Sequence, residues 1–154
     1  MRDKRFVAAH RGGPLETRQH RALMAWGRNC AKHVLPLMPD ELDQRLIDAI
    51  AVSRRWEAGE VQTGVAQKAS VAAHAAAREY RSGVSVAIAR SIAQAAATAH
   101  FADHCLVAAF YALKAAKLGE VSAELERAWQ DDQLGADIRD LVLQNRGTRE
   151  NSIA

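Results

Sequence analysis

The stretch that decides the fold runs from Ser85 to Lys117 and reads SVAIARSIAQAAATAHFADHCLVAAFYALKAAK. It contains neither Pro nor Gly, and its apolar residues recur at the three- and four-residue spacing of a helix. Alanine, the best helix former, is its commonest residue. One straight helix of this length would exceed what globular domains ordinarily use. We therefore predict a helical segment that bends or breaks within residues 99–103.

The same periodicity indicates helices along the rest of the chain, and no segment alternates with a period of two for long enough to predict a strand. In addition to the long run, helices are expected at residues 15–35, 41–58, 62–81, 122–129 and 136–144. Pro36, Gly59 and Gly119 are the expected stops. Asp40 is the expected N-cap of the second helix, with Asp43 three residues later. The sequence thus predicts an all-α fold, a single helical bundle of six or seven helices.

Length and composition fit one globular domain. The chain has 154 residues, of which 49% are hydrophobic and 25% charged, as in ordinary globular proteins. Aromatic residues make up only 5%, so we expect an Ala-rich core in which helices approach one another closely. The expected organisation is a flexible N-terminal tail at 1–13, one helical domain at 14–146 and a C-terminal tail at 147–154.

The sequence also indicates the cellular compartment of the protein and the classes of partner that it could bind. Two cysteines, Cys30 and Cys105, do not make a disulfide framework, which favours a reducing compartment. No apolar segment follows the charged start MRDKRF, and Arg90 and Gln94 interrupt the most apolar run. We therefore expect a cytoplasmic protein without a membrane partner. The net charge of +3 comes with no dense basic stripe interleaved with aromatic residues, which disfavours nucleic acid as a partner.

The sharpest candidate site is the pair His100 and His104 in AHFADHC, residues 99–105. Histidines four residues apart share one face of a helix and can supply two ligands to zinc or another divalent metal. Candidates for a third ligand are His74, Asp103 and Cys105. Phe101 stands where a zinc hydrolase of the His-Glu-x-x-His type carries its catalytic Glu, so that hydrolytic chemistry is not supported. The alternative is that these histidines have a structural or interface role.

Other large polar and aromatic side chains are candidates for a binding surface. His74 and Arg78 lie four residues apart in an alanine-rich helix, where each needs solvent or a partner. Arg55 precedes Trp56, and Trp and Arg are the residue types that dominate binding interfaces. Packing of the helices onto the bundle is the alternative role for Trp26 and Trp56. No phosphate-binding loop, Gly-x-Ser-x-Gly elbow or Cys-x-x-Cys motif occurs.

Four motifs give the chain a family resemblance that runs from about Arg11 to Arg146. They are RGGPL at 11–15, WGRNCAKHVLPL at 26–37, AHAAAR at 73–78 and ATAHFADH at 97–104. With them the chain resembles a bacterial family described as putative immunity proteins, which are small helical proteins linked to toxin systems. The resemblance implies an all-α fold and neutralisation of a toxin by direct binding. The resemblance also covers ETRQHRALMA at 16–25 and AIAVSRRWEAGE at 49–60, so family motifs fall on His20, Trp26, Cys30, Trp56, His74, Arg78, His100 and His104.

We therefore predict a non-catalytic protein that binds a cognate toxin and needs no cofactor. The predicted binding residues are His20, Trp26, Arg55, Trp56, His74, Arg78, His100 and His104. One alternative is a metal-binding protein or enzyme that uses a cluster of His74, His100 and His104. Another is a homo-oligomer, because the alanine-rich faces could meet a second copy as readily as a neighbouring helix.

Overall fold

The computed structural model describes residues 2–153, which form seven α-helices and no named strand. The helices are α1 (Thr17–His33), α2 (Gln44–Glu57), α3 (Thr63–Glu79), α4 (Gly83–Ala97), α5 (His104–Leu118), α6 (Ala123–Asp132) and α7 (Arg139–Ile153). Three short 3-10 helices precede or follow α1, at Lys4–Phe6, Ala9–Arg11 and Leu35–Leu37. The all-α helical bundle predicted from the sequence is confirmed. No helix within residues 2–153 is both long and apolar enough to cross a membrane.

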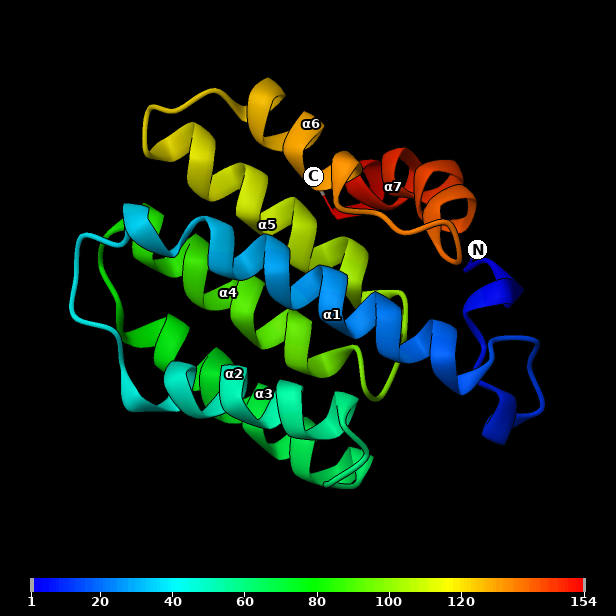
Figure 1. Cartoon of the computed structure of the whole chain (residues 1–154). Coiled ribbons are helices and arrows are strands. Elements are labelled where there is room, and N and C mark those ends of the chain that lie inside the picture. The colour runs from blue at the N-terminus through cyan, green and yellow to red at the C-terminus, as the bar shows by residue number, and fades with distance from the viewer. Residues whose placement is uncertain (1, 154) are drawn as a thin grey trace.

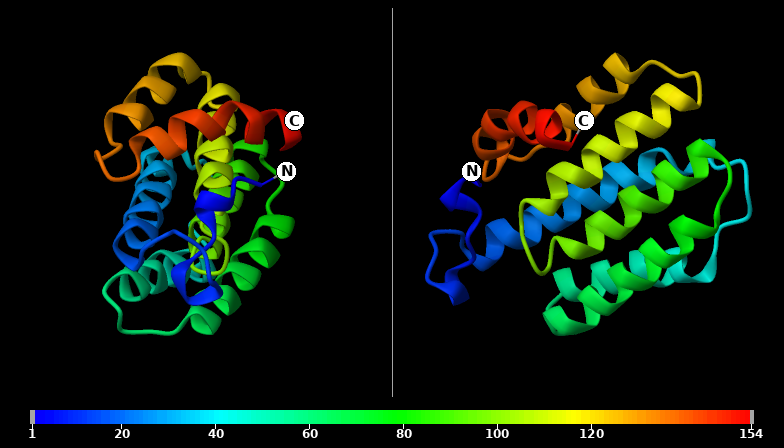
Figure 2. Two further views of the ribbon diagram at one scale, coloured as in Figure 1. Left: turned by 90° about the vertical axis from the view of Figure 1, so that its right-hand side faces the viewer. Right: turned by 180° about the vertical axis from the view of Figure 1, so that it is seen from behind.

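Helix α4 is the centre of the bundle. Helices α1, α4 and α5 lie side by side, α2 and α3 cover one side of this layer, and α6 and α7 pack on the far side of α5 (Figure 1). The same three-tiered order is seen from the side and from behind (Figure 2). Helix α4 contacts α1, α2, α3 and α5, so it is almost enclosed by other helices. This enclosure explains why the sequence of α4 is apolar on nearly every face.

The long apolar run breaks into two antiparallel helices. Helix α4 ends at Ala97 and α5 begins at His104, and residues 98–103 form a turn, called here the α4–α5 turn. Small side chains let α4 approach its neighbours closely, and the buried hydroxyls bond across the gap. Ser91 donates to the carbonyl of Ala108 on α5 at 2.7 Å. Periodicity could predict the place of this break but not the full reversal, because both helices keep an apolar pattern through the turn.

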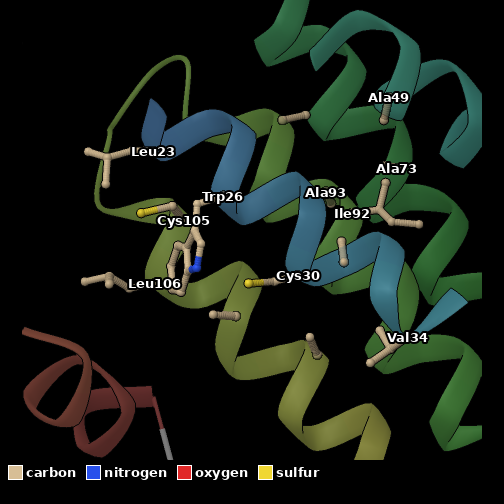
Figure 3. Packing of buried hydrophobic residues seen from close by; sticks show 14 of the residues in the cluster. Leu23, Trp26, Cys30, Val34, Ala49, Ala73, Ile92, Ala93, Cys105 and Leu106 are labelled. Carbon is tan, nitrogen blue, oxygen red and sulfur yellow. The ribbon is translucent and has the colours of Figure 1, made fainter. Parts of the chain in front are cut away.

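Trp26 and the two cysteines lie in the core between α1 and α5 (Figure 3). The Trp26 side chain is 2% exposed, and its indole N–H donates to the carbonyl of Gln130 at 2.8 Å. Cys30 and Cys105 are fully buried free thiols, and burial raises the pKa of each. A buried thiol with a raised pKa is a poor nucleophile. The close approach of the two helices depends on Gly27, where an added Cβ would lie 3.2 Å from the Cα of Cys105.

The N-terminal segment differs from the flexible tail expected from the sequence. Residues 2–13 include two 3-10 turns, and Phe6 inserts into the core with 6% of its surface exposed. Backbone bonds also join Ala8 and Leu15: the amide of Ala9 donates to the carbonyl of Leu15 at 2.8 Å. The segment is therefore held by an apolar anchor and a short ladder of backbone bonds. Met1 lies outside the described residues.

Two further helix boundaries correct the sequence prediction. Asp43, not Asp40, caps α2: its carboxylate accepts from the amide of Arg45, whereas Asp40 accepts a hydrogen bond from the Ser85 hydroxyl of α4. The last helix does not end near residue 144 but continues to Ile153, across the segment predicted as a C-terminal tail. Buried Arg146 explains this extension, since it bonds to Gln130 and Asp131 of α6 and thereby fixes α7 on the bundle. Ala154 lies outside the described residues.

Candidate binding site at the α4–α5 turn

The α4–α5 turn brings together five of the eight residues predicted to bind a partner. They are His20 from α1, Trp56 from α2, His74 from α3, His100 in the turn and His104 at the start of α5. The turn lies at the end of the bundle where α1 begins and where α2 leads into α3 (Figure 1). A small apolar cluster of Met24, Ala66 and Ala99, packed against Trp56, secures the turn on these helices.

His20 is a structural residue beneath the turn. Its side chain is buried, and its Nε2 lies 2.6 Å from the carbonyl oxygen of Thr98, to which the ring donates. The ring also meets Trp56 edge to face, with 4.7 Å between centroids. The Trp56 indole N–H in turn donates to the hydroxyl of Thr63 at 3.2 Å. Burial lowers the pKa of His20, so the ring is neutral at physiological pH and carries its proton on Nε2.

A chain of polar side chains runs across α3, α4 and α5 beside the turn. Arg90 donates to Nδ1 of His74 at 2.6 Å, and burial together with this guanidinium lowers the pKa of His74 to about 4. His104 donates from Nδ1 to the amide oxygen of Gln94 at 2.7 Å. The amide nitrogen of Gln94 lies 3.5 Å from Nε2 of His74, so one carboxamide stands between the two rings. Burial is the largest cause that lowers the pKa of both imidazoles.

His100 faces away from that chain and toward the N-terminal segment. Its Nδ1 lies 3.2 Å from a guanidinium nitrogen of Arg11, which donates to it. Next to it the Phe101 ring is covered by the guanidinium groups of Arg2 and Arg11, each 4.8 Å from the ring centroid. Cation–π contacts of this kind tie the N-terminal segment to the turn.

The three histidines of the alternative metal cluster are thus not brought to one point. Gln94 separates His74 from His104, and His100 points to Arg11. Across residues 2–153 no group of three His, Cys, Asp or Glu side chains could hold a metal ion. Gln94 and Arg90 are the residues that the sequence reasoning missed. The sequence does contain a signal for both residues. They interrupt the apolar run and lie four positions apart, on one face of α4.

The other three predicted residues lie elsewhere. Trp26 is in the core, where the Arg146 guanidinium lies 5.5 Å from its ring centroid. Arg55 is exposed near the end of α2 and forms an ion pair with Glu60 at 3.6 Å. Arg78 is exposed near the end of α3. None of these three contributes to the arrangement around the α4–α5 turn.

Comparison with known proteins gives one match. The model of the family described as Imm-5 like putative immunity protein matches residues 13–137, which include helices α1 to α6 and the α4–α5 turn. The comparisons with curated proteins and with solved structures found no match. The matched region covers most of the 154 residues and confirms the resemblance seen in the sequence motifs. The chain belongs to the Imm-5 like putative immunity protein family.

Proposed function

We propose that this protein binds a cognate protein toxin and blocks it by covering part of its surface, with no chemistry of its own. Membership of an immunity protein family supports a toxin as the partner. The histidines around the α4–α5 turn support the non-catalytic part of the proposal. Their ring nitrogens are engaged by Thr98, Arg90, Gln94 and Arg11, so they act as structural bonds between helices.

The observation that carries the proposal furthest is the distribution of charge. Residues 2–21 hold six of the 21 Lys and Arg side chains but only two of the 18 carboxylate side chains. The six are Arg2, Lys4, Arg5, Arg11, Arg18 and Arg21. Arg2, Arg5 and Arg18 form ion pairs with Asp103, Asp3 and Asp137, and the other three form none within residues 2–153. This segment and the start of α1 form one end of the bundle, called here the basic end (Figure 2). Electrostatic complementarity steers association, so the basic end fits an acidic surface on the toxin.

The basic end contains a groove. It has a volume of about 450 Å³ and is lined by residues of the N-terminal segment, α1 and the α2–α3 connection, among them His10, Arg21 and Trp56. Arg55 adjoins Trp56 in sequence and is exposed. Arg and Trp beside a groove are the usual components of an interface hot spot. We place the centre of the toxin interface here.

The test is complex formation with the toxin encoded beside this gene. We expect the two proteins to co-purify and this protein to protect cells that express the toxin. The charge reversals Arg21→Glu and Arg55→Glu are expected to weaken the complex by roughly tenfold or more each, as for hot-spot residues. Lys117→Glu, an equal charge change at the far end of α5, is the matched control and should bind as the native protein does.

Two results would overturn the proposal. If the neighbouring gene encodes no toxin and this protein protects against no effector, toxin binding is wrong. If the complex forms but all three reversals weaken it equally, the toxin does not recognise the basic end. Weakening of the native complex by added salt would be the supporting sign for an interface that depends on charge.

A further inference from the structure

Two adjoining cavities lie between the N-terminal segment, the α4–α5 turn and α7. The larger, of about 250 Å³, is bordered by Arg2, Asp103, Asn145 and Arg149. The smaller, of about 120 Å³, is mostly apolar and is bordered by Phe6, Val7, Ala8, Phe101 and Ala102. Arg2, Asp3, Phe6 and Asp103 line both cavities, so the two form one continuous space with a polar and an apolar compartment.

Asp103 is the buried charge in this space. Its residue surface is 4% exposed, and its Oδ2 lies 3.0 Å from Nε of Arg2, with which it forms an ion pair. Its Oδ1 is buried and has no hydrogen-bond partner among the described residues. A buried carboxylate oxygen without a partner is destabilising, because it has lost its hydration and has formed no hydrogen bond to replace it. Asp103 lines both cavities, so a donor that enters them is a group that could satisfy this oxygen.

Arg149 offers an unused hydrogen-bond donor in the polar compartment. Its Nε is also buried and has no hydrogen-bond partner within residues 2–153, so its N–H can donate to a ligand. The other carboxylate at the cavity, that of Asp3, cannot serve it, because Asp3 already accepts bonds from Arg5 and Asn145. The space thus presents a free anionic acceptor, a free cationic donor and an apolar compartment beside them.

We infer that this space binds an α-amino acid unit with an apolar side chain and a free α-ammonium group. The ammonium would donate to Oδ1 of Asp103, and the neighbouring carbonyl or carboxylate oxygen would accept from Nε of Arg149. The side chain would enter the apolar compartment against Phe6 and Phe101. A volume of about 120 Å³ holds several water-sized groups, which is room for a branched aliphatic side chain. The inference is independent of toxin binding.

This chemistry has two sources, a free amino acid or the N-terminus of a peptide, and three small probes distinguish them. L-leucine carries the ammonium and a carboxylate, L-leucinamide keeps the ammonium and a neutral carbonyl, and N-acetyl-L-leucine lacks the ammonium. Each probe is titrated into the full chain and followed by calorimetry and by NMR shifts of the residues around Asp103. We expect binding of the first two and none of the third. Stronger binding of leucine indicates a free amino acid, and equal or stronger binding of leucinamide indicates a peptide N-terminus.

Variants test the two polar contacts. Asp103→Asn keeps the shape of the side chain but removes its charge, and it should weaken leucine binding by roughly tenfold or more, as for the loss of a charge-assisted bond. Arg149→Lys keeps the charge but removes the Nε donor, and it should also weaken binding. Asp132→Asn is the matched control at an exposed site on α6 and should bind normally.

The inference is wrong if neither leucine nor leucinamide binds the native protein, or if N-acetyl-L-leucine binds as well as they do. It is also wrong if folded Asp103→Asn and Arg149→Lys both bind leucine with native affinity. Because the probe series uses the native chain, the inference can be refuted even if a variant fails to fold.

Discussion

The stability of this protein should fall between pH 7 and pH 5, and His74 should account for a measurable part of the fall. Burial and the adjacent Arg90 lower the pKa of His74 from 6.5 to about 4. A lowered pKa in the folded state means that the unfolded chain takes up the proton first. The stabilisation is therefore complete above the unfolded pKa and is lost as the pH falls toward the folded pKa.

The size of the effect follows from linkage. With pKa values of 6.5 unfolded and about 4 folded, the free energy of unfolding would be about 2 kcal/mol lower at pH 5 than at pH 7. Part of the ring contacts solvent, and screening reduces this to about 1 kcal/mol. The lowered pKa values of His20, His100 and His104 act in the same direction. The pKa of Asp43 is lowered to about 2, so the stabilisation that this carboxylate provides is lost mainly below pH 5. Between pH 7 and pH 5 the fall in stability therefore comes from the histidines.

The assay is urea unfolding of the native protein and of His74→Asn at both pH values. Asn offers an amide oxygen to Arg90 in place of Nδ1 but does not titrate in this range. We expect the variant to lose about 1 kcal/mol less than the native protein between pH 7 and pH 5. Equal losses in the two proteins would show that His74 is not held neutral and would refute the role assigned to Arg90.

Two predictions concern the packing that holds the site. Gly27→Ala places a methyl group 3.2 Å from the Cα and Cβ of Cys105. This overpacking should cost about 1–3 kcal/mol of stability, and the higher helix propensity of Ala should offset about 1 kcal/mol of that cost. Gly147→Ala on α7, with open space around it, should raise the melting temperature; a rise for both variants would contradict the close contact of α1 and α5. Arg146→Met should cost about 3 kcal/mol in urea unfolding, because it leaves the buried amide oxygen of Gln130 without its partner. A loss below about 1 kcal/mol would show that α7 is held by its apolar contacts instead.

The candidate site was only partly visible in the sequence. The spacing of His100 and His104 suggested that both rings face one way, as on a single helix. The break at the α4–α5 turn instead places His100 in the turn, bonded to Arg11, and leaves His104 at the start of α5, bonded to Gln94. Helical spacing predicts shared direction only while the helix continues. That is why the pair became two separate contacts.

The contacts that complete the site come from distant parts of the chain. Arg11 and His100 are 89 residues apart, and His20 lies 78 residues from Thr98. Nothing in local spacing links such residues, because their meeting depends on which helices pack together. The buried Asp103 and its partner Arg2 belong to the same class of long-range contact.

The sequence by itself determined the all-α class, the number of helices and most of their stops. These features depend on local physics: alanine propensity, apolar periodicity and the glycines at helix ends. Only the tertiary structure decided that the long run folds back on itself, that Phe6 anchors the N-terminal segment and that Arg146 extends α7. Each of these results from burial or pairing between helices distant in sequence, and such energy exists only once the bundle has formed.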